Sequence, residues 1–228
     1  MSEWDMARDD GPILAQIIRF LRPHRHLEFG TWQGYGSKLV LENSQATVWS
    51  VNLLEGEHHS DGLPAYVGPL SVTCRAKGLL GKIISRITNE KQVVQTDAYE
   101  QVGSLVHAAG LGNRLNQIFC DSTKWETSAY PDGFFDSILI DGGHQSAVVA
   151  SDTQKALPLL REGGVIFWHD FCLDQNVRKK FPHVNTVIAG VEAVAEELKK
   201  QGISLYWIDP SWLLCGIKGH VPIPTAKS

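Results

Sequence analysis

Residues 26–37, HLEFGTWQGYGS, run from an apolar strand-like segment through a glycine-rich turn into a helix-like segment. The apolar run ends at an acid, and glycines follow at positions 30, 34 and 36. Glycine tolerates the backbone conformations of a sharp turn and lets a ligand approach the main chain closely. The stretch therefore predicts a strand–turn–helix unit of an α/β fold, with a ligand bound at the turn.

Strand-like and helix-like segments alternate along the rest of the chain. The pattern predicts helices at 12–21, from 38, near 97–109, at 146–160 and at 191–202, strands at 25–29, 46–54, 116–122, 135–141 and 165–170, and a closing hairpin of 203–209 with 213–218. Gly163 and Gly164 are expected to close the loop before the fifth strand. This alternation favours a mostly parallel sheet with helices on both faces. The short final link requires at least one antiparallel strand.

The length of 228 residues fits one domain covering residues 1–228. Residues 55–115 form an insert between the second and third strands that is longer than a usual connection. Such an insert is expected to act as a lid, a substrate wall or an oligomer contact. The tail, 219–228, is expected to be loose.

Composition excludes several classes of protein. The net charge of −4, without a basic block, gives no footprint for nucleic acid or for an anionic membrane. No apolar run approaches the roughly 20 residues of a membrane span. The four cysteines form no CxxC pair, and the N-terminus MSEWDMARDD is acidic and polar, unlike a secretory signal. We therefore expect a protein of the reduced, cytoplasmic compartment with no nucleic-acid or membrane partner.

The spacing of the glycines argues against phosphate ligands. A dinucleotide fingerprint, GxGxxG from Gly30, would need glycine where the chain has Trp32 and Tyr35. The phosphate-binding pattern GxxxxGK[ST] fails as well. What remains is E-x-G-x-x-x-G followed by the hydroxyl of Ser37, which suits a ligand with a cation and an amino-acid head.

Three stretches together resemble one family. LEFGTWQGYGS resembles the first motif of class I S-adenosylmethionine-dependent methyltransferases, and FDSILIDGGHQS and LLREGGVIFWHDF are similar to the IDGxH and GGxxxxHD strand ends of a small-molecule, O-methyltransferase-like subgroup. The resemblance covers residues 25–54 and 116–172. It implies a doubly wound, Rossmann-like sheet of seven strands, mostly parallel with the last strand antiparallel, and S-adenosylmethionine as cofactor.

The resemblance also implies a set of cofactor contacts. The methionine part would lie against Glu28, Gly30 and Gly34, hydroxyl contacts would come from Thr31 and Ser37, and adenine would face Asp121 and Ser122. One position departs from the family, which normally has an acid at the end of the second strand for the ribose hydroxyls. Here the residue is Asn52. Either Asn52 serves, Glu55 reaches in, or the cofactor binds weakly.

Four polar residues follow two neighbouring strands and are the candidates for catalysis: Asp141, His144, His169 and Asp170. In one mechanism, Asp141, His169 and Asp170 hold a divalent metal such as Mg²⁺, which lowers the pKa of the acceptor hydroxyl. In the other, His144 or His169 is a general base without a metal. His183 and the remaining histidines are expected to take no part.

The leading hypothesis is methyl transfer from S-adenosylmethionine to a small-molecule acceptor, at a hydroxyl oxygen. The alternatives are metal-dependent oxidation on the same scaffold and a cofactor-binding protein without catalysis. Trp32 and Trp168, at strand ends, are candidates to flank the sulfonium through a cation–π contact. The long insert favours a homo-oligomer.

Overall fold

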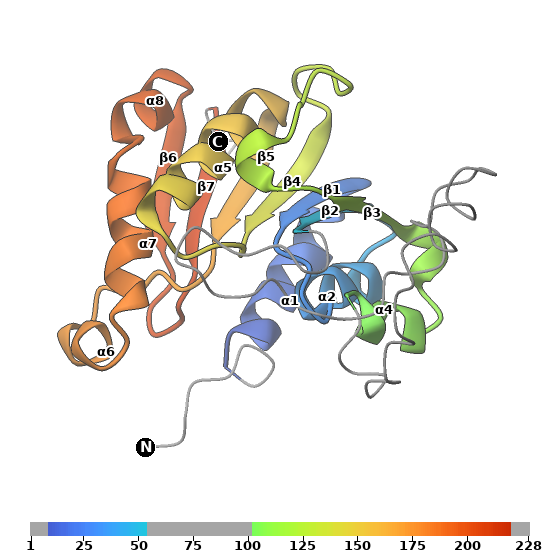
Figure 1. Ribbon diagram of the computed structural model, residues 1–228, viewed down its shortest axis with the longest axis horizontal. Helices are drawn as coiled ribbons and strands as arrows, with labels where there is room; N and C mark the ends of the chain where they lie inside the picture. Colours follow the sequence, from blue (N-terminus) through green and yellow to red (C-terminus); the bar gives the residue numbers. More distant parts are fainter. Residues whose placement is uncertain (1–8, 54–101, 220–228) are drawn as a thin grey trace, which may run out of the picture.

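The computed structural model describes residues 9–53 and 102–219 (Figure 1). Its sheet has seven strands in the order β3-β2-β1-β4-β5-β7-β6. The strands are β1 (Arg25–Phe29), β2 (Thr47–Asn52), β3 (Leu115–Phe119), β4 (Phe135–Ile140), β5 (Leu160–Trp168), β6 (Ile203–Trp207) and β7 (Leu214–Lys218). The first five pair in parallel, and β7 runs antiparallel to both β5 and β6. The predicted α/β sheet, with its antiparallel last strand, is confirmed.

Helices cover both faces of this sheet (Figure 1). They are α1 (Gly11–Leu21), α2 (Tyr35–Asn43), α4 (Ser104–Ala108), α5 (Ser146–Leu159), α6 (Gln175–Lys180), α7 (His183–Glu192) and α8 (Ala195–Lys200), with short 3₁₀ turns η3 (Gly112–Arg114) and η4 (Ser122–Lys124). Among the described residues, no helix combines the length and the apolar character needed to cross a membrane.

Two apolar clusters hold these layers together. On one face, Leu14 and Ile18 of α1 join α2 and Phe167 of β5. On the other, α5, α7 and α8 pack against strand residues such as Ile138 and Trp168. Successive strand residues therefore serve opposite faces, as the pleat of a β-strand requires.

Backbone pairing brings the predicted site residues to one edge of the sheet. The Gly30 amide donates to Val51 O at 2.8 Å, and the Asp141 amide donates to Phe29 O at 2.9 Å. The His169 amide donates to Ile140 O at 3.1 Å. The ends of β1, β4 and β5 are thus tied together, and this is the edge where open α/β sheets bind ligands.

Three sequence expectations need correction. The fifth strand begins at Leu160, not at 165, because Leu160 already pairs with Phe135 before an irregularity in the register. Gly163 and Gly164 therefore lie within β5.

The predicted helix 191–202 is the end of α7 followed by α8, and α6 and most of α7 were missed. α7 is rich in β-branched residues, but its buried side chains pack into the core, and this packing outweighs their weak helix propensity.

Much of the predicted insert, 54–101, lies outside the described residues, as does 220–228 of the predicted tail. Of the helix expected near 97–109, the described part is helical at Ser104–Ala108.

Candidate active site

The glycine turn after β1 packs directly against the loop after β4. Gly30 has a φ of +94°, and a Cβ built on it would lie 2.1 Å from the carbonyl oxygen of Asp141. Gly34 has a φ of +87° and precedes the first residue of α2. A side chain at Gly30 would therefore meet rigid backbone, so the requirement for glycine is both conformational and steric.

A buried polar network lies beneath this turn. Ser50 Oγ donates to Glu28 Oε2 at 2.8 Å, and Ser37 also donates to this carboxyl oxygen. The hydroxyls of Thr31 and Ser50 are 2.7 Å apart, and Gln117 Nε2 donates to Thr31 Oγ1 at 2.7 Å. Burial raises the pKa of Glu28 to about 8, although the hydrogen bonds from the two serines oppose the rise.

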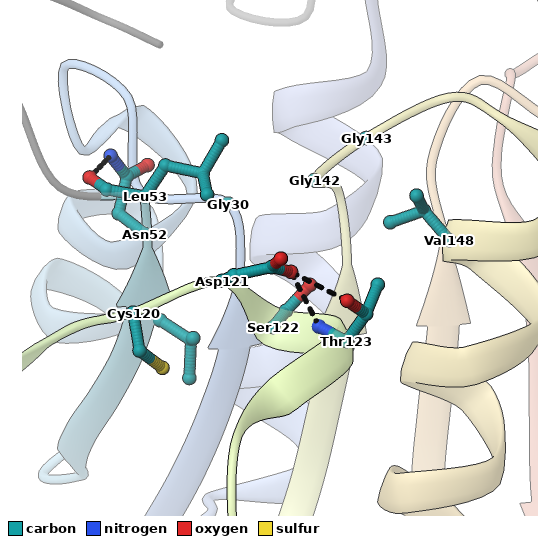
Figure 2. Close-up of a pocket in the computed structure, with 11 residues that line it drawn as sticks. Gly30, Asn52, Leu53, Cys120, Asp121, Ser122, Thr123, Gly142, Gly143 and Val148 are labelled. Carbon is teal, nitrogen blue, oxygen red and sulfur yellow. Dashed lines mark hydrogen bonds between the residues drawn. The ribbon is translucent and has the colours of Figure 1, made fainter. Parts of the chain in front are cut away.

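These residues support the turn from below and do not line the cavity above it. That cavity lies at the carboxyl ends of β1–β4 (Figure 2). Four of the eight predicted cofactor residues line it: Gly30, Asn52, Asp121 and Ser122. The rest of its lining is Val51, Leu53, Cys120, Thr123, Gly142, Gly143 and Val148. Glu28, Thr31, Gly34 and Ser37 are buried behind it.

Asn52, the residue that departs from the family pattern, bridges the turn and the second strand. Its Oδ1 accepts from the amides of Thr31 at 3.1 Å and Trp32 at 3.2 Å, and its Nδ2 donates to Leu53 O at 3.0 Å. Asn52 therefore shapes the turn while it lines the cavity (Figure 2). Glu55, the other candidate for the ribose, lies outside the described residues.

Asp121 organises the opposite wall of the cavity. Its Oδ1 accepts from the amide of Thr123 at 3.0 Å and from the hydroxyl of Thr123 at 2.7 Å (Figure 2). Lys124 Nζ lies 3.0 Å from Asp121 Oδ2. Partial burial opposes ionisation, but these hydrogen bonds outweigh it and lower the pKa of Asp121. The carboxylate thus caps the turn that follows β3.

The four predicted catalytic residues form one cluster, and His183 of α7 joins it. His144 Nε2 lies 2.7 Å from Asp170 Oδ2, and His183 Nε2 lies 3.7 Å from Asp170 Oδ1. His169 Nδ1 lies 3.1 Å from Asp141 Oδ1 and 3.5 Å from Asp170 Oδ2. Asp170 has a φ of +57°, a left-handed conformation that aspartate tolerates better than most residues.

Charge sets the protonation of this cluster. Burial opposes the charged form of His144, but the hydrogen bond and charge of Asp170, together with Asp141, raise its pKa above the ordinary value. Burial likewise opposes the cation of His169, yet the carboxylates of Asp141, Asp170 and Asp10 raise its pKa well above the ordinary value. The pKa of Asp170 is held well below its usual range, because the nearby histidines outweigh its burial.

The cluster also provides donors for a metal ion. One ligand atom each from Asp141, His144 and Asp170 lies within 4.8 Å of the others. The predicted metal set contained both carboxylates but had His169 in place of His144. The oxygen and imidazole donors fit a divalent cation.

Two residues of this region were missed by sequence reasoning. His183 had been set aside, and Asp10, in the N-terminal segment, contacts His169 Nε2 at 3.0 Å. No local pattern marks either, because both meet the site only through the tertiary fold. Of the two tryptophans considered for the sulfonium, Trp168 is fully buried and donates to Thr153, whereas Trp32 is 59% exposed. Trp168 is therefore a core residue.

A seven-stranded sheet with a glycine turn after β1 and a cavity over the carboxyl ends of β1–β4 defines the class I methyltransferase fold. A family model described as a methyltransferase domain matches residues 27–171. The chain belongs to this family of methyltransferase domains. No curated protein sequence matches it.

Solved structures share the fold at low sequence identity. An O-methyltransferase from Bacillus cereus in complex with SAH is 17% identical, with a TM-score of 0.55, over 95% of this chain and 83% of that one. The SAH-bound methyltransferase PaMTH1 of Podospora anserina is 16% identical, with a TM-score of 0.54, over 93% and 78%. The O-methyltransferase TomG of Streptomyces achromogenes, in complex with SAM, is 16% identical, with a TM-score of 0.53, over 92% and 80%.

Proposed function

We propose that this protein transfers the methyl group of S-adenosylmethionine to a hydroxyl oxygen of a small-molecule acceptor. The observation that carries the proposal is the arrangement of one cavity and one polar cluster on the same sheet edge. The loop after β4 joins them, because Gly142 and Gly143 line the cavity while Asp141 and His144 belong to the cluster.

The cavity suits the adenosyl part of the cofactor. It combines the apolar side chains of Val51, Leu53 and Val148 with the polar Asn52 and Asp121. Gly30 presents bare backbone to it, and a larger residue there would displace the loop after β4. The buried network around Glu28 keeps this backbone in place without occupying the cavity. Of the eight predicted cofactor residues, four thus line the cavity and four support the glycine turn beneath it.

S-adenosylmethionine supplies an electrophilic methyl group on a sulfonium, so the protein must orient the acceptor oxygen and take its proton. His144 is half exposed and therefore within reach of an acceptor. Its Nε2 hydrogen bonds to Asp170, which leaves Nδ1 to accept a proton, and the Asp170 carboxylate stabilises the resulting imidazolium. In the alternative mechanism, a divalent ion bound by Asp141, His144 and Asp170 would replace the base and lower the pKa of the acceptor hydroxyl.

The proposal also covers the cellular compartment, the class of acceptor and the oligomeric state. Cys172 and Cys215 are free thiols, which supports a reducing compartment such as the cytoplasm. The acceptor is a small molecule rather than nucleic acid, because the chain carries a net charge of −4. A homo-oligomer formed through the insert remains the expectation for assembly.

Calorimetric titration with S-adenosylhomocysteine and, separately, with NAD tests the cofactor. We expect binding of S-adenosylhomocysteine in the micromolar range and none of NAD. Incubation with S-adenosylmethionine and a panel of catechols, flavonoids and sugars, followed by mass spectrometry, then tests methyl transfer, with and without a chelator. A folded protein that does not bind S-adenosylhomocysteine would overturn the proposal.

A further inference from the structure

The imidazole ring of His169 contacts Asp10, which lies 159 positions earlier in the chain. Asp10 Oδ2 lies 3.0 Å from His169 Nε2, and Asp10 Oδ1 accepts from the amide of Trp212 at 2.9 Å. Asp10 is fully buried. Because both carboxylate oxygens are engaged, the orientation of Asp10 is fixed, and Asp10 in turn fixes the imidazole ring of His169.

The other ring nitrogen of His169 consequently faces the site. Nδ1 lies 3.1 Å from Asp141 Oδ1 and 3.5 Å from Asp170 Oδ2, yet it is buried and makes no aligned hydrogen bond. A buried polar atom without an aligned partner carries a desolvation cost. A positive group between this nitrogen and the two carboxylates would remove that cost.

The same two carboxylates also meet His144. Its Nε2 lies 2.7 Å from Asp170 Oδ2, and its ligand atom is within 4.8 Å of those of Asp141 and Asp170. The donors that converge here are therefore two imidazole nitrogens and two carboxylates. Mg²⁺ and Ca²⁺ prefer oxygen ligands alone, whereas imidazole suits first-row transition metals such as Fe²⁺, Ni²⁺, Cu²⁺ and Zn²⁺.

We propose that Asp10 orients His169 as a second nitrogen ligand, so that Asp141, His144, His169 and Asp170 form a site that selects a transition-metal ion over Mg²⁺. Asp10 is a positioning residue in this site: it takes the place of the carboxylate that commonly accepts the second N–H of a metal-bound histidine. The proposal deepens the proposed function, on which its catalytic relevance rests, but metal binding can be measured without any acceptor.

The first experiment is titration of tag-free, chelator-treated protein with Co²⁺, Zn²⁺ and Mg²⁺. We expect Co²⁺ and Zn²⁺ to bind at least 100-fold more tightly than Mg²⁺, and bound Co²⁺ to show visible absorption bands of a site with nitrogen ligands. Asp10→Asn should weaken Co²⁺ binding by about 10- to 100-fold, the usual effect of removing such a supporting carboxylate. The affinity for S-adenosylhomocysteine should stay unchanged.

Asp132→Asn is the matched control, because Asp132 is an exposed carboxylate in the loop before β4, at the other end of the strand. It should leave metal binding unaltered. Should Asp10→Asn fail to fold, nitrogen NMR of the unmodified protein decides instead, since Zn²⁺ should shift the Nδ1 resonance of His169.

Two results would overturn the proposal: Mg²⁺ binding as tightly as Zn²⁺, or an Nδ1 resonance of His169 that Zn²⁺ does not move. An intact metal site in a protein that binds no S-adenosylhomocysteine would overturn methyl transfer and leave this inference standing. Binding of S-adenosylhomocysteine without selectivity for a transition metal would overturn this inference and leave the proposed methyl transfer standing.

Discussion

Ser50 donates a hydrogen bond to Glu28 at 2.8 Å inside the sheet, directly below the turn that forms the floor of the cavity. The acid of the E-x-G-x-x-x-G pattern is thus a buried support with a pKa raised to about 8. Its ordinary value is 4.5, so the folded protein binds one more proton than the unfolded chain between about pH 4.5 and 8.

We therefore expect the contribution of Glu28 to stability to be complete below pH 4.5 and to be lost as the pH rises through about 8. Glu28→Gln should remove this pH dependence of the free energy of unfolding. A pKa shift of this size corresponds to roughly a few kcal/mol. Urea unfolding of both proteins at pH 6 and pH 9 measures it. Glu126→Gln, at an exposed position, should behave as the unmodified protein does. A difference between the pH values that persists in Glu28→Gln would contradict this assignment.

His26 is expected to act in the opposite direction. Its ring is fully buried, its Nδ1 lies 2.7 Å from Ser137 Oγ, and burial lowers its pKa to about 3. Because the unfolded value is 6.5, the folded protein binds fewer protons below that pH, and stability is lost as the pH falls from 6.5 towards 3. His26→Gln should reduce this acid sensitivity in urea unfolding at pH 7 and pH 4.5. The exposed His24→Gln serves as control and should retain it.

The chain itself offers a matched pair for the glycine turn. Gly30 and Gly110 both have positive φ, at +94° and +71°, but a Cβ on Gly30 meets the Asp141 backbone at 2.1 Å, whereas one on Gly110 meets nothing within 4 Å. Gly110→Ala should cost about 1 kcal/mol, the strain of the left-handed backbone. Gly30→Ala should cost more and abolish binding of S-adenosylhomocysteine in calorimetry. Equal effects of the two substitutions would show that the close approach to Asp141 has no consequence.

The sheet could be predicted from the sequence because its signals are local. The strand β1, the glycine turn and the start of α2 follow one another within residues 25–43, and the polar residues after β4 and β5 stand next to apolar runs. Parallel pairing then places these strand ends together, as the general rule for α/β sheets requires. The grouping of Asp141, His144, His169 and Asp170 was predictable for the same reason.

What escaped prediction depends on contacts between distant segments. Asp10 contacts His169 from the N-terminal segment, and His183 enters the site from α7, which packs against α5. The burial of Glu28 was hidden as well, because a motif shows which residue precedes a turn but not which face of the strand its side chain occupies. Only the packed structure separates residues that line the cavity from those that support it.

Asn52 gives a prediction about cofactor affinity. Its Oδ1 already accepts from two amides of the turn. An aspartate at this position would differ only in having a second carboxylate oxygen in place of Nδ2. Asn52→Asp should keep both amide bonds and supply an oxygen that accepts strongly from a ribose hydroxyl. We expect S-adenosylhomocysteine to bind several-fold more tightly in calorimetry, whereas Asn52→Leu, which loses the amide bonds, should weaken binding. Weaker binding by Asn52→Asp would indicate that the donor bond to Leu53 O is essential.

Substitution of His144 tests the proposed chemistry separately from cofactor binding. It is 46% exposed and belongs to the Asp141–Asp170 cluster, and it does not line the cavity beside Asn52. His144→Asn should lower kcat by roughly 100-fold or more, because a group that handles the proton of the acceptor is lost. The dissociation constant of S-adenosylhomocysteine should change less than about two-fold. His107→Asn, an exposed substitution on α4, should leave both values intact. If His144→Asn retained full turnover, the acceptor proton would have to leave by another route, and the cluster of Asp141, His169 and Asp170 would have to act without this histidine.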